Sequence, residues 1–291
     1  MGRTPDNAVT AVTDSVTGGR PGRLPRITPS DGSPVLSVRD VTVRFGGIVA
    51  LDGVSFDVAA REIVGLIGPN GAGKTTLFNC LSRLYDPSAG SLAFEGQPIG
   101  ATASHRIAAL GISRTFQNLA LFPSLTVLQN VMIGMHCQTG AGFVASALRL
   151  PAVRAEEAKI SERARELVAF FGLEGVAGHP AAGLPFGTLK RVELARALAA
   201  EPRLLLLDEP AAGLNHEEVA ALAGLITTIR KERGLTLLLV EHHMGLVMQV
   251  SDRVVVLDFG RKIAEGTPAE VQQNPDVIRA YLGIAPTDAA R

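Results

Sequence analysis

A glycine-rich segment restricts the possible folds of this chain more strongly than any other part of its sequence. Residues 68–75 read Gly-Pro-Asn-Gly-Ala-Gly-Lys-Thr and match the pattern G-x-x-x-x-G-K-[ST]. An apolar run at 62–68 precedes the segment like a buried strand, and residues 74–84 follow it with helical spacing. Glycines let the backbone curl so that its N–H groups point inward at phosphate oxygens, and the helix dipole adds positive charge there. The segment therefore predicts a phosphate-binding loop between a strand and a helix.

The side chains of this loop indicate a nucleotide bound with magnesium. Lys74 can place its charge against the β- and γ-phosphates, and the Thr75 hydroxyl can bind Mg²⁺. A structural glycine turn is the alternative, but it does not explain a Lys-Thr pair at the start of a helix. The predicted nucleotide-binding residues of the loop are Gly68, Pro69, Asn70, Gly71, Ala72, Gly73, Lys74, Thr75 and Thr76.

An acidic pair after another apolar run supplies the second half of the predicted site. Leucines fill residues 204–207, and Asp208, Glu209 and Pro210 follow. This run places Asp208 at the carboxyl end of a buried strand, beside the phosphate loop of a doubly wound sheet. We expect Asp208 to hold the Mg²⁺ shell and Glu209 to orient or deprotonate an attacking water. A strand that ends in solvated acids before a proline turn is the alternative, and the phosphate loop argues against it.

The remaining strand patterns indicate an α/β fold. Residues 35–45 and 50–58 alternate apolar and polar residues around a Gly-Gly pair, which is typical of half-buried antiparallel strands. Residues 204–208 and 236–241 are continuous apolar runs with a helical pattern, 217–233, between them. Such runs are typical of a parallel sheet that helices cover on both faces.

Two further patterns complete the expected fold. Residues 127–171 are mostly helical in spacing, with a glycine-rich break at 140–142, and residues 253–257 and 262–265 form a predicted closing hairpin. We therefore expect a P-loop NTPase core with a mostly parallel sheet, an antiparallel β subdomain and an α-helical subdomain.

Composition limits the classes of partner and compartment. The chain has 28 Lys and Arg against 28 Asp and Glu, so it has no basic field for nucleic acid, and no nucleic-acid partner is predicted. Apolar residues make up 46%, enough for a large core. No apolar run approaches the roughly 18 residues that cross a bilayer, so we expect a soluble chain. Cys80 and Cys137 are far apart in sequence, and buried, reduced thiols are expected.

The two ends of the chain are predicted to be tails. Residues 1–34 mix Thr, Ser, Gly, Pro and Arg without periodicity, so they bury too little apolar surface to offset their ordering entropy. They also lack the apolar stretch of a secretory signal. We expect a disordered tail over 1–34, one domain over 35–284 with a helical subdomain at about 118–200, and a second tail over 285–291.

With these motifs in this order, residues 35–284 resemble the ATP-binding cassette (ABC) family of ATPases. Gln117, within Arg-Thr-Phe-Gln-Asn, resembles the family's Q-loop glutamine, which contacts metal and water. His242 resembles the switch histidine that faces the γ-phosphate, and Phe45 stands where the family stacks an aromatic ring on adenine. The resemblance implies ATP hydrolysis with Mg²⁺ as cofactor. It implies catalytic roles for Glu209, His242 and Gln117, and Mg²⁺ contacts for Thr75, Gln117 and Asp208.

The segment that resembles the family's signature sequence departs from it. The family has Leu-Ser-Gly-Gly-Gln at the start of a helix, where residues 184–188 read Leu-Pro-Phe-Gly-Thr. Pro185 offers no donor, so it cannot replace the serine that hydrogen-bonds to the γ-phosphate of a second subunit. Gly187 remains, and we expect its N–H and the dipole of a helix beginning there to face that phosphate. Asn215, where the family usually has aspartate, is a further departure.

Several segments resemble the ATP-binding subunits of branched-chain amino-acid importers in particular. They are residues 44–51, 211–215, 241–248 and 274–283. The resemblance implies that the chain powers uptake of branched-chain (hydrophobic) amino acids from the cytoplasmic face of the cell membrane, as a peripheral protein. The implied partners are two integral-membrane permease subunits, a second ABC ATPase subunit arranged head to tail and, indirectly, a substrate-binding protein. His243, where these subunits usually have aspartate, is another departure.

Other functions share part of this pattern. The ATPases of urea and amide import and of lipopolysaccharide export share much of it and are the nearest alternatives within transport. A soluble cassette that acts on nucleic acid would usually have two cassettes or a long coiled-coil insertion, whereas this chain has one phosphate loop and no heptad run. A P-loop kinase has no use for Gln117, His242 or the signature helix. Transport is therefore the favoured class.

Overall fold

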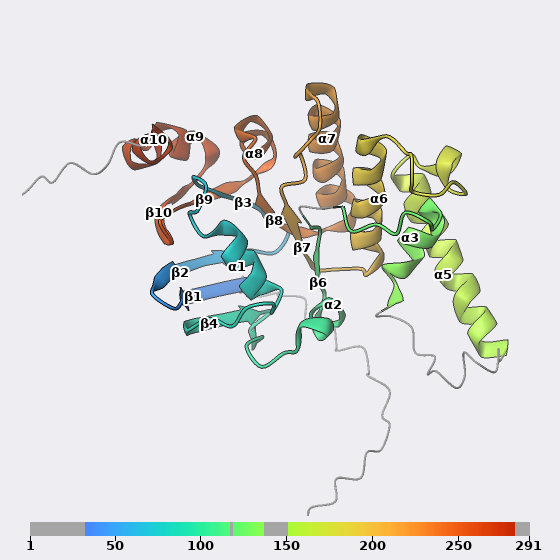
Figure 1. Cartoon of the computed structure of the whole chain (residues 1–291), viewed down its shortest axis with the longest axis horizontal. Helices are drawn as coiled ribbons and strands as arrows, with labels where there is room; N and C mark the ends of the chain where they lie inside the picture. Colours follow the sequence, from blue (N-terminus) through green and yellow to red (C-terminus); the bar gives the residue numbers. More distant parts are fainter. Residues whose placement is uncertain (1–32, 117–118, 137–150, 283–291) are drawn as a thin grey trace, which may run out of the picture.

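The computed structural model describes residues 33–116, 119–136 and 151–282. One sheet consists of β1 (Leu36–Phe45), β2 (Ile48–Val58), β4 (Ala89–Phe94) and β5 (Gln97–Pro98). A second consists of β3 (Ile63–Ile67), β6 (Ile112–Arg114), β7 (Leu204–Asp208), β8 (Thr236–Val240), β9 (Arg253–Asp258) and β10 (Arg261–Gly266). The strand orders are β2-β1-β4-β5 and β10-β9-β3-β8-β7-β6. Figure 1 shows the helical part of the chain beside the second sheet.

The helices follow the strands in a mostly alternating order. They are α1 (Lys74–Leu81), α2 (Ile107–Leu110), α3 (Val127–Ile133), α5 (Pro151–Phe170), α6 (Phe186–Ala199), α7 (His216–Arg233), α8 (Met244–Val250), α9 (Pro268–Gln273) and α10 (Pro275–Leu282). Short 3-10 helices lie at Ser104–Arg106 and Glu174–Val176. Across the described ranges, no helix has the length and apolar character needed to cross a membrane.

The second sheet is buried on both faces, as its apolar runs predicted. β3 pairs parallel with β8 and β9, β7 pairs parallel with β6 and β8, and β10 pairs antiparallel with β9. Because side chains alternate along a strand, Leu204 and Leu206 join the core formed with α1 and the first sheet. Leu205 and Leu207 join the core on the opposite face, which α6, α7 and α8 cover. The expected α/β fold, with its antiparallel and helical parts, is confirmed.

Several predicted boundaries shift for local reasons. The helix expected over 74–84 ends at Leu81, because Arg83 adopts a left-handed backbone with a φ of 57°. The helical region expected over 127–171 contains α3 and α5, and its glycine-rich break lies outside the described residues. Cys80 is buried as expected, whereas Cys137 lies outside the described residues, as do nearly all of the two predicted tails.

Asn215, which stands where the resemblance expects aspartate, is the N-cap of α7. The Asn215 side chain accepts a hydrogen bond from the Glu218 N–H at 3.0 Å, and the Glu218 carboxylate accepts one from the Asn215 N–H at 3.0 Å. This reciprocal cap satisfies two N–H groups of the chain at the helix start, and asparagine does this as well as aspartate. α7 ends at Arg233, and the next residue, Gly234, has a φ of 61°, the left-handed conformation that commonly stops a helix.

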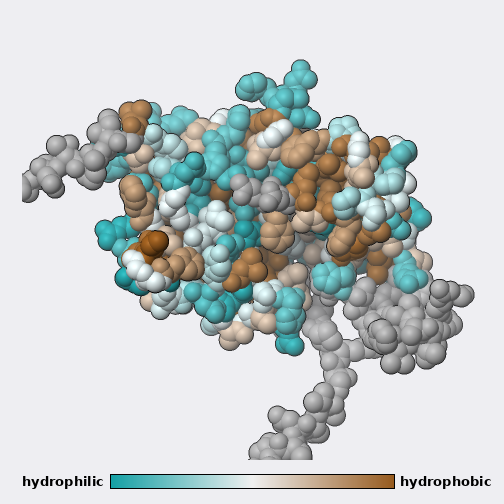
Figure 2. Space-filling view, in the orientation of Figure 1, coloured by the Kyte–Doolittle hydropathy of each residue, from teal (hydrophilic) through white to brown (hydrophobic). Residues whose placement is uncertain are grey.

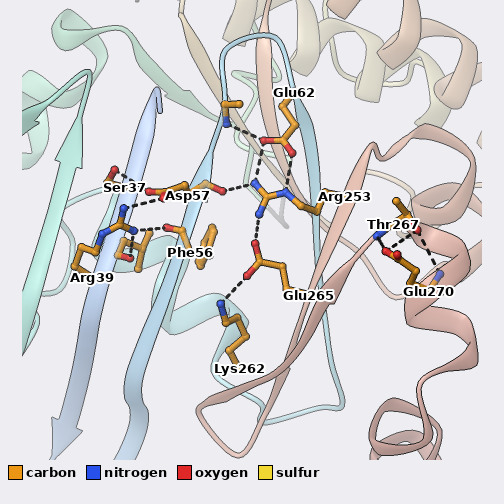
Figure 3. Close-up of polar contacts among 12 residues, drawn as sticks. Ser37, Arg39, Phe56, Asp57, Glu62, Arg253, Lys262, Glu265, Thr267 and Glu270 are labelled. Carbon is orange, nitrogen blue, oxygen red and sulfur yellow. Dashed lines mark hydrogen bonds and ion pairs between the residues drawn. The ribbon is translucent and has the colours of Figure 1, made fainter. Parts of the chain in front are cut away.

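An arginine on β9 ties the two sheets together (Figure 3). Arg253 bonds the Glu62 carboxylate at 2.8 Å and the Asp57 carbonyl of β2 at 2.6 Å, and it pairs with Glu265 on β10. The hydrogen bond to Glu62 is the largest cause of a raised pKa at Arg253, so its guanidinium stays charged. This contact fixes the antiparallel sheet against the parallel sheet, and thereby places β1 and β2 beside the phosphate loop.

Candidate functional site

The loop between β3 and α1 wraps around the side chain of Lys74. Lys74 is only 5% exposed, and its Nζ donates to the carbonyl oxygens of Gly68, at 2.7 Å, and Pro69, at 2.9 Å. Burial lowers the pKa of Lys74, while the negative charge of Glu209 acts in the opposite direction. No side chain caps the start of α1, so the N–H groups of its first turn lack both intrahelical and side-chain acceptors. The loop thus combines a held cation with free backbone donors.

Gly73 is required by both its conformation and its surroundings. It is the N-cap of α1 with a φ of 100°, a region that residues with a Cβ rarely adopt. A Cβ at this position would lie 2.6 Å from the Ala50 carbonyl oxygen and 2.6 Å from the Leu51 side chain, both on β2. The loop therefore packs directly against the antiparallel sheet.

A cavity of about 190 Å³ opens over the loop. It is lined by Ala50, Asn70, Gly71, Ala72, Gly73, Lys74, Thr75, Thr76, Glu209 and His242. Most of the predicted nucleotide-binding residues and two of the predicted catalytic residues therefore meet at one cavity. A wider cavity of about 620 Å³ lies at the end of α7, among Arg61, Arg230 and Arg233, and holds none of the predicted site residues.

Glu209 and His242 face each other on the wall of the 190 Å³ cavity. Glu209 directly follows β7, His242 lies two residues after β8, and Glu209 Oε1 is 2.6 Å from His242 Nε2. Because an ionised carboxylate only accepts hydrogen bonds, the imidazole donates through Nε2. Glu209 adopts a left-handed backbone with a φ of 48°, and its N–H donates to the Val240 carbonyl at 2.8 Å. Such a conformation in a residue with a side chain is typical of functional sites.

Asp208 is buried and paired with an arginine that the sequence pattern did not single out. Its carboxylate lies 2.6 Å from Arg114 on β6, and the two side chains are 5% and 8% exposed. Arg114 also donates to Asn79 at 2.9 Å and to Ser82 at 3.1 Å. Sequence reasoning missed Arg114, because one arginine in a three-residue strand forms no recognisable pattern.

The described side chains offer oxygen atoms of the kind that a magnesium ion binds. Mg²⁺ prefers hard oxygen ligands and is commonly held by one or two protein oxygens together with the phosphates of its nucleotide. The Thr75 residue lines the cavity, and the second oxygen of the Asp208 carboxylate is not used by the Arg114 ion pair. Gln117, the third predicted magnesium contact, lies outside the described residues.

Phe45 lies at the end of β1 with much of its ring exposed. It is 46% exposed, and its ring centroid lies 5.2 Å from that of Tyr85, with the ring planes at 74°. Phe45 pairs with Ile48 at the hairpin that leads to Ala50, which lines the cavity. Sequence reasoning did not identify Tyr85, which holds the edge of the predicted adenine-stacking ring.

The signature segment differs in one respect from the expectation. α6 begins at Phe186 and not at Gly187, because Pro185 is its N-cap, and the N–H groups of Thr188 and Leu189 donate to the Pro185 carbonyl. Gly187 is therefore the second residue of α6. It does not line the cavity of its own chain, and a Cβ added to it would lie 2.5 Å from a Glu218 carboxylate oxygen.

Comparisons with known proteins agree with this geometry. A family model described as ABC transporter matches residues 51–212, and one described as branched-chain amino acid ATP-binding cassette transporter matches residues 261–285. The high-affinity branched-chain amino acid transport ATP-binding protein BraF of Pseudomonas aeruginosa is 43% identical over 252 residues, which is 87% of this chain and 99% of BraF.

Solved structures of ATP-binding cassettes are also similar to this chain. The crystal structure of the ADP conformation of MJ1267, an ATP-binding cassette of an ABC transporter, is 30% identical, with a TM-score of 0.75 over 86% of this chain and 99% of MJ1267. The dimeric structure of a post-hydrolysis state of the cassette MJ0796, bound to ADP and Pi, is 25% identical, with a TM-score of 0.67 over 80% of this chain and 98% of MJ0796. With its phosphate loop, Glu209–His242 pair and carboxyl-terminal segment in the expected places, the chain belongs to the ABC transporter family, among the ATP-binding proteins of branched-chain amino acid transport.

Proposed function

We propose that this chain hydrolyses ATP to power the import of branched-chain amino acids through two permease subunits at the cytoplasmic face of the cell membrane. The observation that carries the proposal is the cavity at which the phosphate loop, Glu209 and His242 meet. BraF, 99% of whose length is matched by this chain, is named for high-affinity branched-chain amino acid transport. The proposed cassette domain spans residues 35–284.

ATP binding begins with a change of partners at Lys74. Its Nζ leaves the carbonyl oxygens of Gly68 and Pro69 and binds the β- and γ-phosphates. The phosphate oxygens carry negative charge and the carbonyl oxygens do not, so the exchange adds an attraction between opposite charges and favours the nucleotide. The N–H groups at the start of α1 receive the other phosphate oxygens. Bound Mg²⁺ neutralises phosphate charge, and Thr75, Asp208 and Gln117 are the residues that would hold it.

Hydrolysis depends on the carboxylate of Glu209. The carboxylate takes a proton from water while the water oxygen forms a bond to the γ-phosphorus. The bond from that phosphorus to the oxygen shared with the β-phosphate breaks, which yields ADP and inorganic phosphate. His242, 2.6 Å from Glu209, orients the carboxylate and turns its imidazole toward the γ-phosphate. The proton taken from water remains on Glu209 until the products leave.

A second cassette completes each nucleotide site. Gly187 does not line the cavity of its own chain, yet it lies in the first turn of α6, where N–H groups lack intrahelical acceptors. We place this turn against the γ-phosphate held by the partner cassette, in the head-to-tail arrangement. Pro185 removes a hydroxyl from that contact, so the backbone carries it alone. The related cassette MJ0796 has a dimeric structure with ADP and Pi bound.

The permease subunits dock on an apolar surface of the helical part. Phe116 and Phe122 are 42% and 48% exposed, and Figure 2 shows apolar side chains gathered over the region of α3 and α6. Asn130, which is buried, donates to the carbonyls of Phe122, Leu125 and Thr126 and holds this segment in shape. A fixed apolar surface that includes Phe116, which precedes Gln117 in the sequence, would let a docked helix follow changes at the nucleotide.

Uptake in a strain that lacks this chain tests the proposed function. The wild-type chain should restore uptake of labelled leucine, whereas Lys74→Ala should not, because the phosphate-binding cation is lost. Lys262→Ala, which removes a lysine paired with Glu265 on β10, is the matched control and should restore uptake. Restored uptake of urea or an amide, with leucine uptake unchanged, would assign the chain to a different importer.

A further inference from the structure

One buried carboxylate joins the two loops that carry Glu209 and His242. Glu241 directly follows β8 and is 3% exposed. Its Oε1 accepts a hydrogen bond from the N–H of Ala211 at 2.6 Å, in the loop after β7. Its Oε2 accepts from the N–H of His242 at 2.9 Å and from the N–H of His243 at 3.1 Å, in the loop after β8. The two oxygens thus divide their contacts between the two loops.

The contact with Ala211 bears on the backbone of Glu209. Glu209 is held in the left-handed region, with a φ of 48°, which residues with a side chain adopt only at an energetic cost. Its own N–H is anchored to the Val240 carbonyl at 2.8 Å, and Ala211, two residues later, is anchored to Glu241. The strained residue therefore lies between two anchors, and both anchors lead to neighbouring residues at the end of β8.

The hydrogen bond from the His242 N–H closes a ring of contacts that runs from Glu241 through His242 and Glu209 to Ala211 and back to Glu241. The His242 backbone is bound to Glu241, and its imidazole lies 2.6 Å from the Glu209 carboxylate. We infer that Glu241 is a positioning residue for ATP hydrolysis, which sets the distance and orientation between Glu209 and His242 by binding the backbone of Ala211, two residues after Glu209, and the backbone of His242 itself. This inference rests on the proposed function, because it assigns Glu241 to the same hydrolytic site.

The negative charge of Glu241 is what allows three donors to converge on it. Backbone N–H groups that point at a buried carboxylate form charge-assisted bonds, and each loses an acceptor if the carboxylate is removed. Glutamine has nearly the same volume, but it replaces one acceptor oxygen with an NH2 group, which repels an N–H donor. Glu241→Gln therefore releases either Ala211 or the pair His242 and His243 without creating a cavity.

ATP binding and turnover by the full chain, measured separately, test the inference. For Glu241→Gln we expect kcat to fall by on the order of 10²-fold, the scale of a small misplacement of catalytic groups. The Kd for a fluorescent ATP analogue should stay within about twofold, because Glu241 does not line the cavity and Lys74 is held by the carbonyls of Gly68 and Pro69. Glu270→Gln is the matched control: its carboxylate also accepts a backbone N–H, from Thr267 at 2.7 Å (Figure 3), but it lies on α9, which contributes no residue to the cavity. Its kcat and Kd should match the wild type.

A double-mutant cycle separates positioning from general damage. If Glu241 acts through His242, Glu241→Gln added to His242→Ala should lower single-turnover hydrolysis much less than it does alone. Independent losses that multiply, or an equal loss of kcat and ATP affinity, would overturn the inference, as would a wild-type kcat. If Glu241→Gln does not fold, Glu241→Asp, which is one methylene shorter, should show the same kcat-selective loss. Failure of the wild-type chain itself to hydrolyse ATP would instead reject the proposed function.

Discussion

The ion pair between Asp208 and Arg114 shows how burial decides the energetic weight of a single residue. Both side chains are under 10% exposed, and the guanidinium also lies 5.5 Å from the centre of the Phe78 ring. Removing one partner of such a pair leaves an uncompensated buried charge, whereas replacing both partners removes the cause of the penalty. We therefore expect folding to depend on Arg114, the residue that holds the predicted magnesium ligand Asp208.

This argument predicts the stability of Arg114→Met. We expect a loss of about 3–5 kcal/mol in the free energy of unfolding, measured by urea denaturation, because Asp208 is left buried and unpaired. The double variant Arg114→Met/Asp208→Asn should lose less than the single variant. Arg39→Met is the control, because Arg39 and Asp57 are 49% and 40% exposed, and an exposed pair contributes only about 0–1 kcal/mol. Equal losses for Arg114→Met and Arg39→Met would contradict the argument.

Two glycines of the phosphate loop are expected to differ in their tolerance of a methyl group. Gly71 has a φ of 81° but no atom within 4 Å of an added Cβ, so Gly71→Ala should cost only the left-handed backbone, about 1–2 kcal/mol. Gly73→Ala also forces a contact with the Ala50 carbonyl oxygen and should cost a further 1–3 kcal/mol or so. Thermal unfolding and ATP binding check this order. A Gly73→Ala chain as stable as Gly71→Ala would show that the loop does not pack on β2 as described.

At the scale of elements, the parts that sequence reasoning predicted are those with a repeating pattern. The continuous apolar runs of β7 and β8 and the alternation in β1 and β2 were sufficient, because burial on one or two faces leaves a periodic trace. The three residues of β6 and the two of β5 are too short to show a period, and both strands were missed. Their positions depend on pairing with strands distant in sequence.

The candidate site divides in the same way. The phosphate loop, Asp208, Glu209 and His242 lie in contiguous motifs, and motif and strand order together placed them at one edge of the sheet. Arg114, Tyr85 and Glu241 act through contacts with residues from other segments, so no local pattern reveals them. The start of α6 was misplaced by one residue, because the hydrogen bonds to the Pro185 carbonyl decide it.

The packing of α1 makes a prediction about thiol chemistry. Cys80 lies on the buried face of this helix, and burial raises the pKa of its thiol to about 11. At pH 8 only about one thiol in a thousand would then be ionised, compared with about a quarter for a free cysteine. In a Cys137→Ser background, Ellman's reagent should leave the folded chain unmodified and react fully in guanidinium chloride. Rapid reaction of the folded chain would show that α1 does not pack against the sheets as described.

In the fold as a whole, no residue of the signature segment, 184–188, lines the nucleotide cavity of its own chain. The cavity holds the phosphate loop, Glu209 and His242, while Gly187 lies elsewhere on the same chain. In the proposed arrangement, ATP bound in the cavity presents its γ-phosphate outward, to a second cassette. The nucleotide would join two chains as long as it stays intact, and hydrolysis would separate them, which is how a chemical step becomes a rigid-body motion.

Glu209→Gln tests this coupling directly. Glutamine cannot take the proton from water, so we expect ATP to bind while its hydrolysis falls by at least about 10²-fold. The variant should then elute from size exclusion with ATP at twice the 30.5 kDa mass of the chain, and as a monomer with ADP. Lys74→Ala added to Glu209→Gln should abolish the dimer, because the phosphates lose their cation. The single variant Glu217→Gln, on the first turn of α7, is the control and should behave as the wild type. A Glu209→Gln chain that binds ATP but remains monomeric would mean that the intact nucleotide does not join two copies of this chain, and that the partner cassette is a different protein.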